Sequence, residues 1–161
     1  MKKFKTHTLK EYSNALSAKK PVPGGGSAAA LTAGLGVALI SMVAHYSLGK
    51  NKSPKVDLKI KKILRKSEKL RKRLLDLVDL DAKAYLKVVA ARKGSLKKKQ
   101  NALNEAREIP MEVCRLSYEA MELTPFLVAK GNKNLLSDIQ VSVELLMAAF
   151  NAAMVNVKIN K

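Results

Sequence analysis

Tryptophan is absent from this 161-residue chain, and aromatic residues make up only 4% of it. Runs of alternating β-branched and aromatic residues bounded by turn residues, which are typical of strands, are also missing. Hydrophobic residues nevertheless account for 47% of the chain, which excludes a disordered polypeptide and is enough for a core. We therefore predict an all-α fold, a multi-helical bundle with an aliphatic, alanine-rich core.

Cysteine is almost absent, since Cys114 is the only one, and this excludes an intrachain disulfide and a cysteine metal site. His7 and His45 are too few to form a metal site, so we expect no metal. The basic N-terminus is not followed by an apolar segment. We therefore expect no secretory signal and a cytoplasmic location.

Acidic residues are scarce: 13 aspartates and glutamates face 31 lysines and arginines, giving a net charge of +18. Such an excess favours a polyanionic partner, namely nucleic acid, an acidic membrane surface or a multiply charged substrate. Six cations recur every three or four residues along one expected helix: Lys55, Lys59, Lys62, Lys66, Lys69 and Arg73. This stripe is either a solvated face or a phosphate-binding face. The scarcity of aromatics argues against sequence-specific recognition of nucleic acid.

Apolar periodicity and helix-end signals predict helices over residues 8–19, 28–48, 54–92, 96–108 and 110–130, and from about 137 to the C-terminus. Thr8 and Glu11 form a capping-box pattern at the first helix, and Pro110 is expected to separate the fourth helix from the fifth. The uncharged, alanine- and glycine-rich helix over 28–48 is predicted to be a buried core helix rather than a membrane span. No internal repeat or long linker divides the chain, so we expect a single domain over 1–161.

Asp81 falls on the apolar stripe of the long helix, between Leu77 and Tyr85. A buried carboxyl has a raised pKa and can act as a general acid, or it can form a structural ion pair; the pattern leaves both open. Asp79 lies two positions away and points to another face, where a solvated surface charge is the favoured interpretation.

Three further features could contribute to a binding site. The segment Pro23, Gly24, Gly25, Gly26 and Ser27 opens a helix, where backbone N–H groups attract anions, but a tight structural turn has the same sequence. Asp138 begins the last helix, where Ser137 or Asp138 is expected to cap its N-terminus. Asn156 lies in the same apolar helix, where a packing hydrogen bond is favoured over a ligand contact.

The order and spacing of these motifs resemble one family over roughly residues 8–160: the cyclodeaminase domain of formiminotransferase-cyclodeaminase and the related methenyl-tetrahydrofolate cyclohydrolases. The resemblance rests on PGGGSAAA at 23–30, GK at 49–50, LVDLDAKAY at 77–85, IP at 109–110, GN at 131–132, SDIQV at 137–141 and NVKIN at 156–160.

The resemblance implies a dimeric helical bundle that acts on one-carbon tetrahydrofolate derivatives, either closing formimino-tetrahydrofolate with loss of ammonia or hydrolysing the methenyl form. Both reactions need proton transfer and no redox step, so no cofactor is expected. The resemblance assigns the acid–base role to the position matching Asp79 or Asp81, and Asp81 is favoured because the apolar stripe of the helix buries it. By the same resemblance Asp138 is a second candidate. The substrate-binding candidates are Pro23, Gly24, Gly25, Gly26, Ser27, Lys50 and Asn156.

Two departures from the family pattern keep an alternative open. The family continues beyond the NVKIN motif with another helix, whereas this chain stops at Lys161, and the strong positive charge is not typical of the family. The alternative is a catalytically inactive member that binds nucleic acid or an acidic partner through its lysines. Cyclodeaminase and cyclohydrolase activity use the same positions, so the sequence does not separate them.

Overall fold

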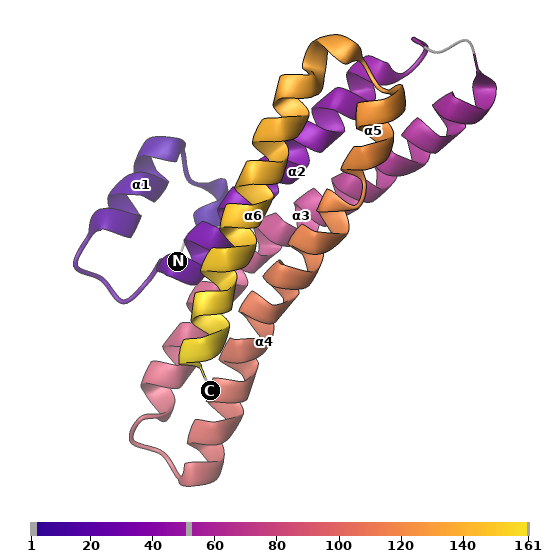
Figure 1. The fold of residues 1–161 in the computed structure, drawn as a ribbon. Coiled ribbons are helices and arrows are strands. Elements are labelled where there is room, and N and C mark those ends of the chain that lie inside the picture. Colours follow the sequence, from indigo (N-terminus) through magenta and orange to yellow (C-terminus); the bar gives the residue numbers. More distant parts are fainter. Residues whose placement is uncertain (1–2, 51–52, 161) are drawn as a thin grey trace.

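A computed structural model describes residues 3–50 and 53–160, and within these ranges it contains helices and no strand (Figure 1). The predicted all-α fold is therefore confirmed. The elements in chain order are the 3-10 helix η1 (Phe4–Thr6), α1 (Leu9–Ser17), α2 (Gly25–Ser47), α3 (Pro54–Ala91), α4 (Leu96–Met121), α5 (Thr124–Lys130), η2 (Lys133–Leu135) and α6 (Leu136–Ile159).

Four long helices form the bundle. α2 packs along α3 and α6, and α4 packs along the same two helices from the other side. The pair α2 and α6 therefore forms one side of the bundle, and the pair α3 and α4 forms the opposite side. The short α1 lies outside the four helices, near the N-terminal end of α2 (Figure 1).

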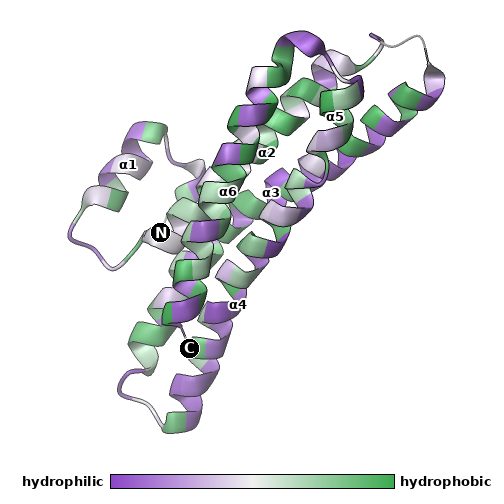
Figure 2. Cartoon of the chain, viewed as in Figure 1, coloured by the Kyte–Doolittle hydropathy of each residue, from purple (hydrophilic) through white to green (hydrophobic). Residues whose placement is uncertain are grey.

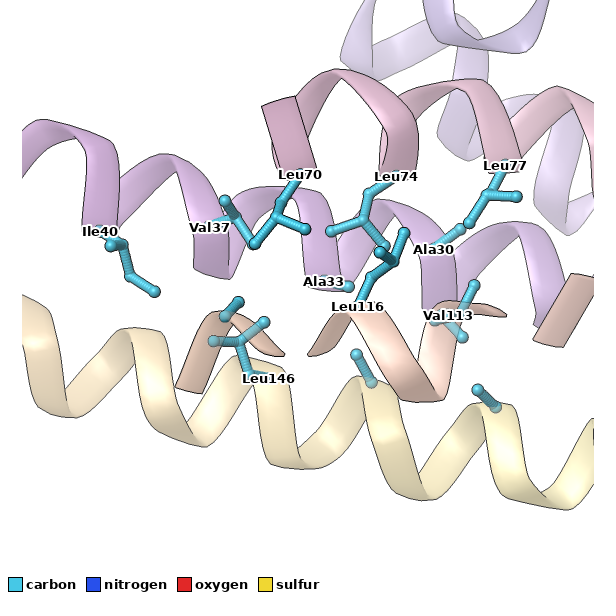
Figure 3. Packing of buried hydrophobic residues seen from close by; sticks show 14 of the residues in the cluster. Ala30, Ala33, Val37, Ile40, Leu70, Leu74, Leu77, Val113, Leu116 and Leu146 are labelled. Carbon is cyan, nitrogen blue, oxygen red and sulfur yellow. The ribbon is translucent and has the colours of Figure 1, made fainter. Parts of the chain in front are cut away.

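The predicted central helix is α2, and it is buried as expected. Ala30, Ala33, Val37 and Ile40 have no exposed surface and face aliphatic side chains of the other three long helices (Figure 3). A β-carbon at Gly36 would lie only 2.9 Å from Cγ of Leu146, so the glycine is what allows α2 and α6 to approach this closely. The core is therefore filled by closely packed helices with small and aliphatic side chains rather than by large aromatic side chains.

Two helices are long and apolar enough to cross a membrane by length and composition alone: Gly25–Ser47 and Lys133–Ile159. They differ in their surroundings. In the first helix, 61% of the most apolar 18-residue stretch is buried inside the bundle, as in the core helix of a globular protein. In the second helix, only 28% of the corresponding stretch is buried. α6 therefore has a largely uncovered apolar face.

The prediction of two helices separated at Pro110 is wrong. α4 runs without interruption from Leu96 to Met121 with Pro110 inside it, and the chain breaks only before α5. A proline lacks the N–H that would bond the carbonyl four residues earlier, which belongs to Ala106. The side-chain amide of Asn160, the residue that follows α6, donates to that carbonyl at 3.3 Å and so supplies the bond that α4 lacks.

Capping residues and glycine predict the helix boundaries better than Pro110 does, with one exception. Thr8 and Glu11 form the predicted capping box, and Gly49 ends α2 with a positive φ of 69°. The predicted cap by Ser137 or Asp138 is wrong, because α6 begins at Leu136, and its N-cap residue is Leu135, with no side-chain cap. Asp138 lies within the first turn, where its charge still favours the helix dipole.

Candidate active site

A polar pocket of about 280 Å³ lies where α2 begins. The glycine turn forms one wall, Asp81 and Tyr85 of α3 form a second, and Asn156 and its neighbours near the end of α6 form a third. Ala106 of α4 completes the lining, so four helices that are far apart in the sequence contribute to one site. Among the described residues, no three histidine, cysteine or acidic side chains are grouped closely enough to hold a metal ion.

Asp81 and the glycine turn fit closely together. A β-carbon at position 26 would overlap the Asp81 carboxylate, so only glycine leaves room for that side chain. The backbone N–H of Ser27, in the first turn of α2, donates to the same carboxylate. The glycine turn thus places a helix N-terminus directly against an acid, a geometry that stabilises negative charge.

Burial raises the pKa of the Asp81 carboxyl above its usual value, and the hydrogen bond from the Ser27 N–H opposes part of that rise. Within the described residues no cation forms an ion pair with Asp81, so the structural ion pair that the sequence left open is not what holds it. A carboxyl with a raised pKa that faces a pocket can donate and accept a proton closer to neutral pH.

The interpretation of Asp79 as a solvated charge is wrong. Asp79 is only 8% exposed, and its Oδ1 accepts a hydrogen bond of 2.6 Å from the backbone N–H of Phe4. η1 packs on this face of α3, and Lys5 also pairs with Asp76 there. Asp79 therefore anchors the N-terminal segment and does not line the pocket. The periodicity of α3 could not reveal this because the covering segment lies 75 residues earlier.

Tyr12 is a contributor to the site region that the sequence analysis missed. Its hydroxyl lies 3.0 Å from Oγ of the fully buried Ser27, so α1 braces the first turn of α2 from behind. Burial raises the pKa of the Tyr12 hydroxyl, and the nearby Asp81 charge adds to the rise. Nothing in the sequence indicates where the short α1 docks, although its capping box did predict that the helix exists.

The predicted site residues fall into two groups. Gly24, Gly25, Gly26 and Asn156 line the pocket with Asp81, while Pro23 and Ser27 are buried just behind its wall. The Asn156 amide borders the pocket and donates to the Ala152 carbonyl of its own helix at 3.0 Å, which is a bond within α6 rather than the favoured packing bond between helices.

Lys50 and Asp138 form the second group, and they lie at the far end of the bundle. Lys50 follows the 23-residue α2, and Asp138 precedes Asn156 by 18 residues of α6. At 1.5 Å per residue these separations are each about 25–35 Å along the helix axis. Within this chain the structure does not bring either residue to the Asp81 pocket.

An all-helical bundle with one desolvated carboxyl facing a small polar pocket defines a protein suited to proton-transfer chemistry on a small molecule. The profile of the family described as Formiminotransferase-cyclodeaminase matches residues 8–161. The chain belongs to this family, as the motif order predicted.

Individual relatives agree with the family match. The chain is 34% identical to a methenyltetrahydrofolate cyclohydrolase of Methylorubrum extorquens, over 95% of this chain and 78% of that protein. It is 29% identical to formimidoyltransferase-cyclodeaminase of Rattus norvegicus, over 95% of this chain but only 30% of that protein. The crystal structure of a formiminotetrahydrofolate cyclodeaminase from Thermotoga maritima superposes with a TM-score of 0.93 at 35% identity, over 96% of this chain and 78% of that one.

Proposed function

We propose that this chain is an enzyme of one-carbon folate metabolism that acts on a tetrahydrofolate derivative as a cyclodeaminase or a cyclohydrolase. The observation that carries the proposal is the Asp81 carboxyl, which faces the pocket, is desolvated by burial and is bonded to the Ser27 N–H. The names of the relatives supply the substrate class.

One carboxyl that gains and loses a proton suffices for either reaction. In ring closure, the second folate nitrogen attacks the formimino carbon, the protonated Asp81 donates its proton to the nitrogen that leaves as ammonia, and the carboxylate recovers a proton from the nitrogen that attacked. In hydrolysis, the ionised Asp81 takes a proton from the water that attacks the methenyl carbon and returns it to the nitrogen as the C–N bond breaks, while the proton of the new hydroxyl group passes to solvent as the formyl group forms. Both steps are general acid–base catalysis at a carbon that becomes tetrahedral.

The pocket is smaller than the range of about 300–1,000 Å³ that is usual for small-molecule sites. A folate-sized ligand therefore extends past the rim. Tyr85 and Ile159 line the pocket and are 41% and 74% exposed, which leaves an aromatic ring and an aliphatic side chain available to a flat heterocycle. We assign the reacting carbon to the Asp81 side of the pocket and the remaining substrate to this rim.

The proposed activity is tested directly with the two candidate substrates. A cyclodeaminase should convert formimino-tetrahydrofolate to the methenyl form with release of ammonia, so that the ultraviolet absorbance of the methenyl form increases. A cyclohydrolase should hydrolyse methenyl-tetrahydrofolate, so that the same absorbance decreases. A reduced folate should also raise the melting temperature, because a ligand that binds only the folded state stabilises it. Folded protein that turns over neither substrate would contradict the enzymatic proposal.

We further propose that the chain acts as a homodimer that pairs through the α2–α6 side of the bundle. α2 contains no lysine, arginine or acidic residue, and between Asp138 and Lys158 α6 has only Glu144. Apolar side chains are exposed on both helices: Leu35, Tyr46, Val141, Met147 and Val155. An apolar face of this extent favours association, and two +18 chains that meet there avoid placing lysines against lysines.

Met147→Glu tests this arrangement, because Met147 is 47% exposed and its replacement leaves the core of the single chain intact. We expect the wild-type protein to be a dimer by light scattering, and Met147→Glu to be a monomer because the new charge cannot be buried unpaired. Leu96→Glu is the matched control, since Leu96 is 84% exposed at the start of α4 and should leave the dimer intact. A monomeric wild type, an unaffected Met147→Glu dimer or recovery only with membranes would each contradict the proposal.

A further inference from the structure

A concentration of positive charge lines a groove on the α3–α4 side. Two adjoining hollows, of about 750 and 420 Å³, share Lys62 and Lys66. Together they are lined by eight lysines and arginines and only two carboxylates, Glu112 and Glu119. We refer to the two hollows as the basic groove, and Figure 2 shows the hydrophilic segments that recur along α3 and α4 beside it.

The cations of α3 form a regular row along the groove. They are Lys55, Lys59, Lys62, Lys66, Lys69 and Arg73, each three or four residues from the next. Neighbours at this spacing lie about 5–6 Å apart on a helix surface. The whole row extends over about 27 Å of helix axis. It is therefore long enough to meet several successive charges on an extended ligand.

Not all of these cations are neutralised by the protein. Arg73 makes a two-pronged ion pair with Glu112, and Lys66 pairs with Glu119. Lys62, Arg65 and Lys69 are exposed and form no ion pair within the described part of the chain. These three side chains are available to an external anion.

The floor of the basic groove is apolar. Ile63, Leu70 and Leu116 line it and are each about 5% exposed. A single strand of nucleic acid has the matching chemistry, because its phosphates carry the charge and its unstacked bases are apolar on their faces. A duplex encloses its bases, and a flat bilayer does not enter a groove, so neither uses this floor.

We propose that the basic groove binds single-stranded nucleic acid without reading its sequence. Backbone phosphates pair with the lysine row of α3, and bases lie on the apolar floor beside Arg65 and Arg115. Few aromatic residues are present to stack on bases, which is consistent with binding dominated by charge. The groove is on the side opposite α2 and α6, so it stays open in the proposed dimer, and it shares no lining residue with the Asp81 pocket.

The test compares two triple variants that lose the same charge. Lys62→Ala, Arg65→Ala and Lys69→Ala together remove three cations of the groove that form no ion pair among the described residues. The control combines Lys10→Ala, Lys19→Ala and Lys20→Ala, which are exposed in and after α1. Binding of a fluorescently labelled single-stranded RNA is measured by anisotropy at several salt concentrations, and circular dichroism checks that both variants are folded.

We expect the wild-type protein to bind the strand with an affinity that falls steeply with salt. The groove variant should lose at least ~10-fold in affinity near 0.1 M salt, and the slope of log K against log salt should fall by about 2. The control should change less than about twofold. If the two variants lost equal affinity for the strand, the effect would be explained by net charge alone and the proposal would be overturned. Absent binding, or equal affinity for a duplex, polyglutamate or anionic vesicles, would overturn it as well.

Discussion

Asp81→Asn should abolish turnover of the folate substrate while the protein stays folded. The amide has nearly the shape of the carboxyl, so it fits beside Gly26, but it cannot give or take a proton at neutral pH. Removing a general acid–base group typically costs about 10²- to 10⁴-fold in rate. The measurement is kcat for the absorbance change of the methenyl form, with circular dichroism to confirm the fold.

The same substitution should raise the melting temperature at neutral pH. Burial raises the pKa of Asp81 in the folded protein, so the folded state binds this proton more strongly than the unfolded state does. Stability is therefore lost as pH rises from the ordinary pKa of 3.8 toward the raised folded pKa, and the loss is complete above that value. Asparagine cannot ionise, so the Asp81→Asn protein does not lose this stability as the pH rises. A thermal unfolding series against pH should show the two proteins diverging across this window.

Asp79→Asn is the matched control, two residues away on the same helix. Asp79 is also buried, but it receives the Phe4 N–H and does not line the pocket. We expect this variant to weaken the attachment of η1 and to retain the acid–base group. If Asp79→Asn abolished turnover and Asp81→Asn did not, the assignment of proton transfer to Asp81 would be wrong.

Most of the fold was predictable because its signals are local. The Thr8 capping box, the positive φ of Gly49 and the three-and-four spacing of apolar residues in α3 each depend on a few neighbouring residues. The errors arose where distant segments meet. Asp79 is buried by a segment from the N-terminus, and the carbonyl that Pro110 leaves without its helical partner is bonded by the distant Asn160. Periodicity within one helix contains no information about these partners.

The site was predictable in part for a related reason. The motif order contained the glycine turn, Asp81 and Asn156, and the packing of α2, α3 and α6 does bring them to one pocket. The same list contained Lys50 and Asp138, which rigid helices of 23 and 24 residues hold at the other end of the bundle. Order along a chain does not give distance once long helices separate the motifs. Tyr12 was missed because its partner, Ser27, is found only by docking α1.

Gly26→Ala should damage the site as severely as loss of the carboxyl itself. The added β-carbon would overlap the Asp81 carboxylate, and the short aspartate side chain has little freedom to move away from the start of α2, against which it packs. We expect the carboxyl to be displaced from the Ser27 N–H, turnover to fall by about 10²-fold or more, and stability to fall by about 1–3 kcal/mol, as in other overpacked sites. Gly34→Ala is the control on the same helix, because its β-carbon would make only an ordinary 3.5 Å contact with Leu75.

A double-mutant cycle separates this clash from a general intolerance of alanine at position 26. If the lost stability comes from overlap with the carboxylate, then Gly26→Ala should cost far less in an Asp81→Ala background, where that carboxylate is absent. Chemical unfolding of the four proteins gives the coupling free energy, which should account for most of the 1–3 kcal/mol. A coupling near zero, or a Gly26→Ala enzyme with normal turnover, would mean that the glycine is not there to make room for Asp81.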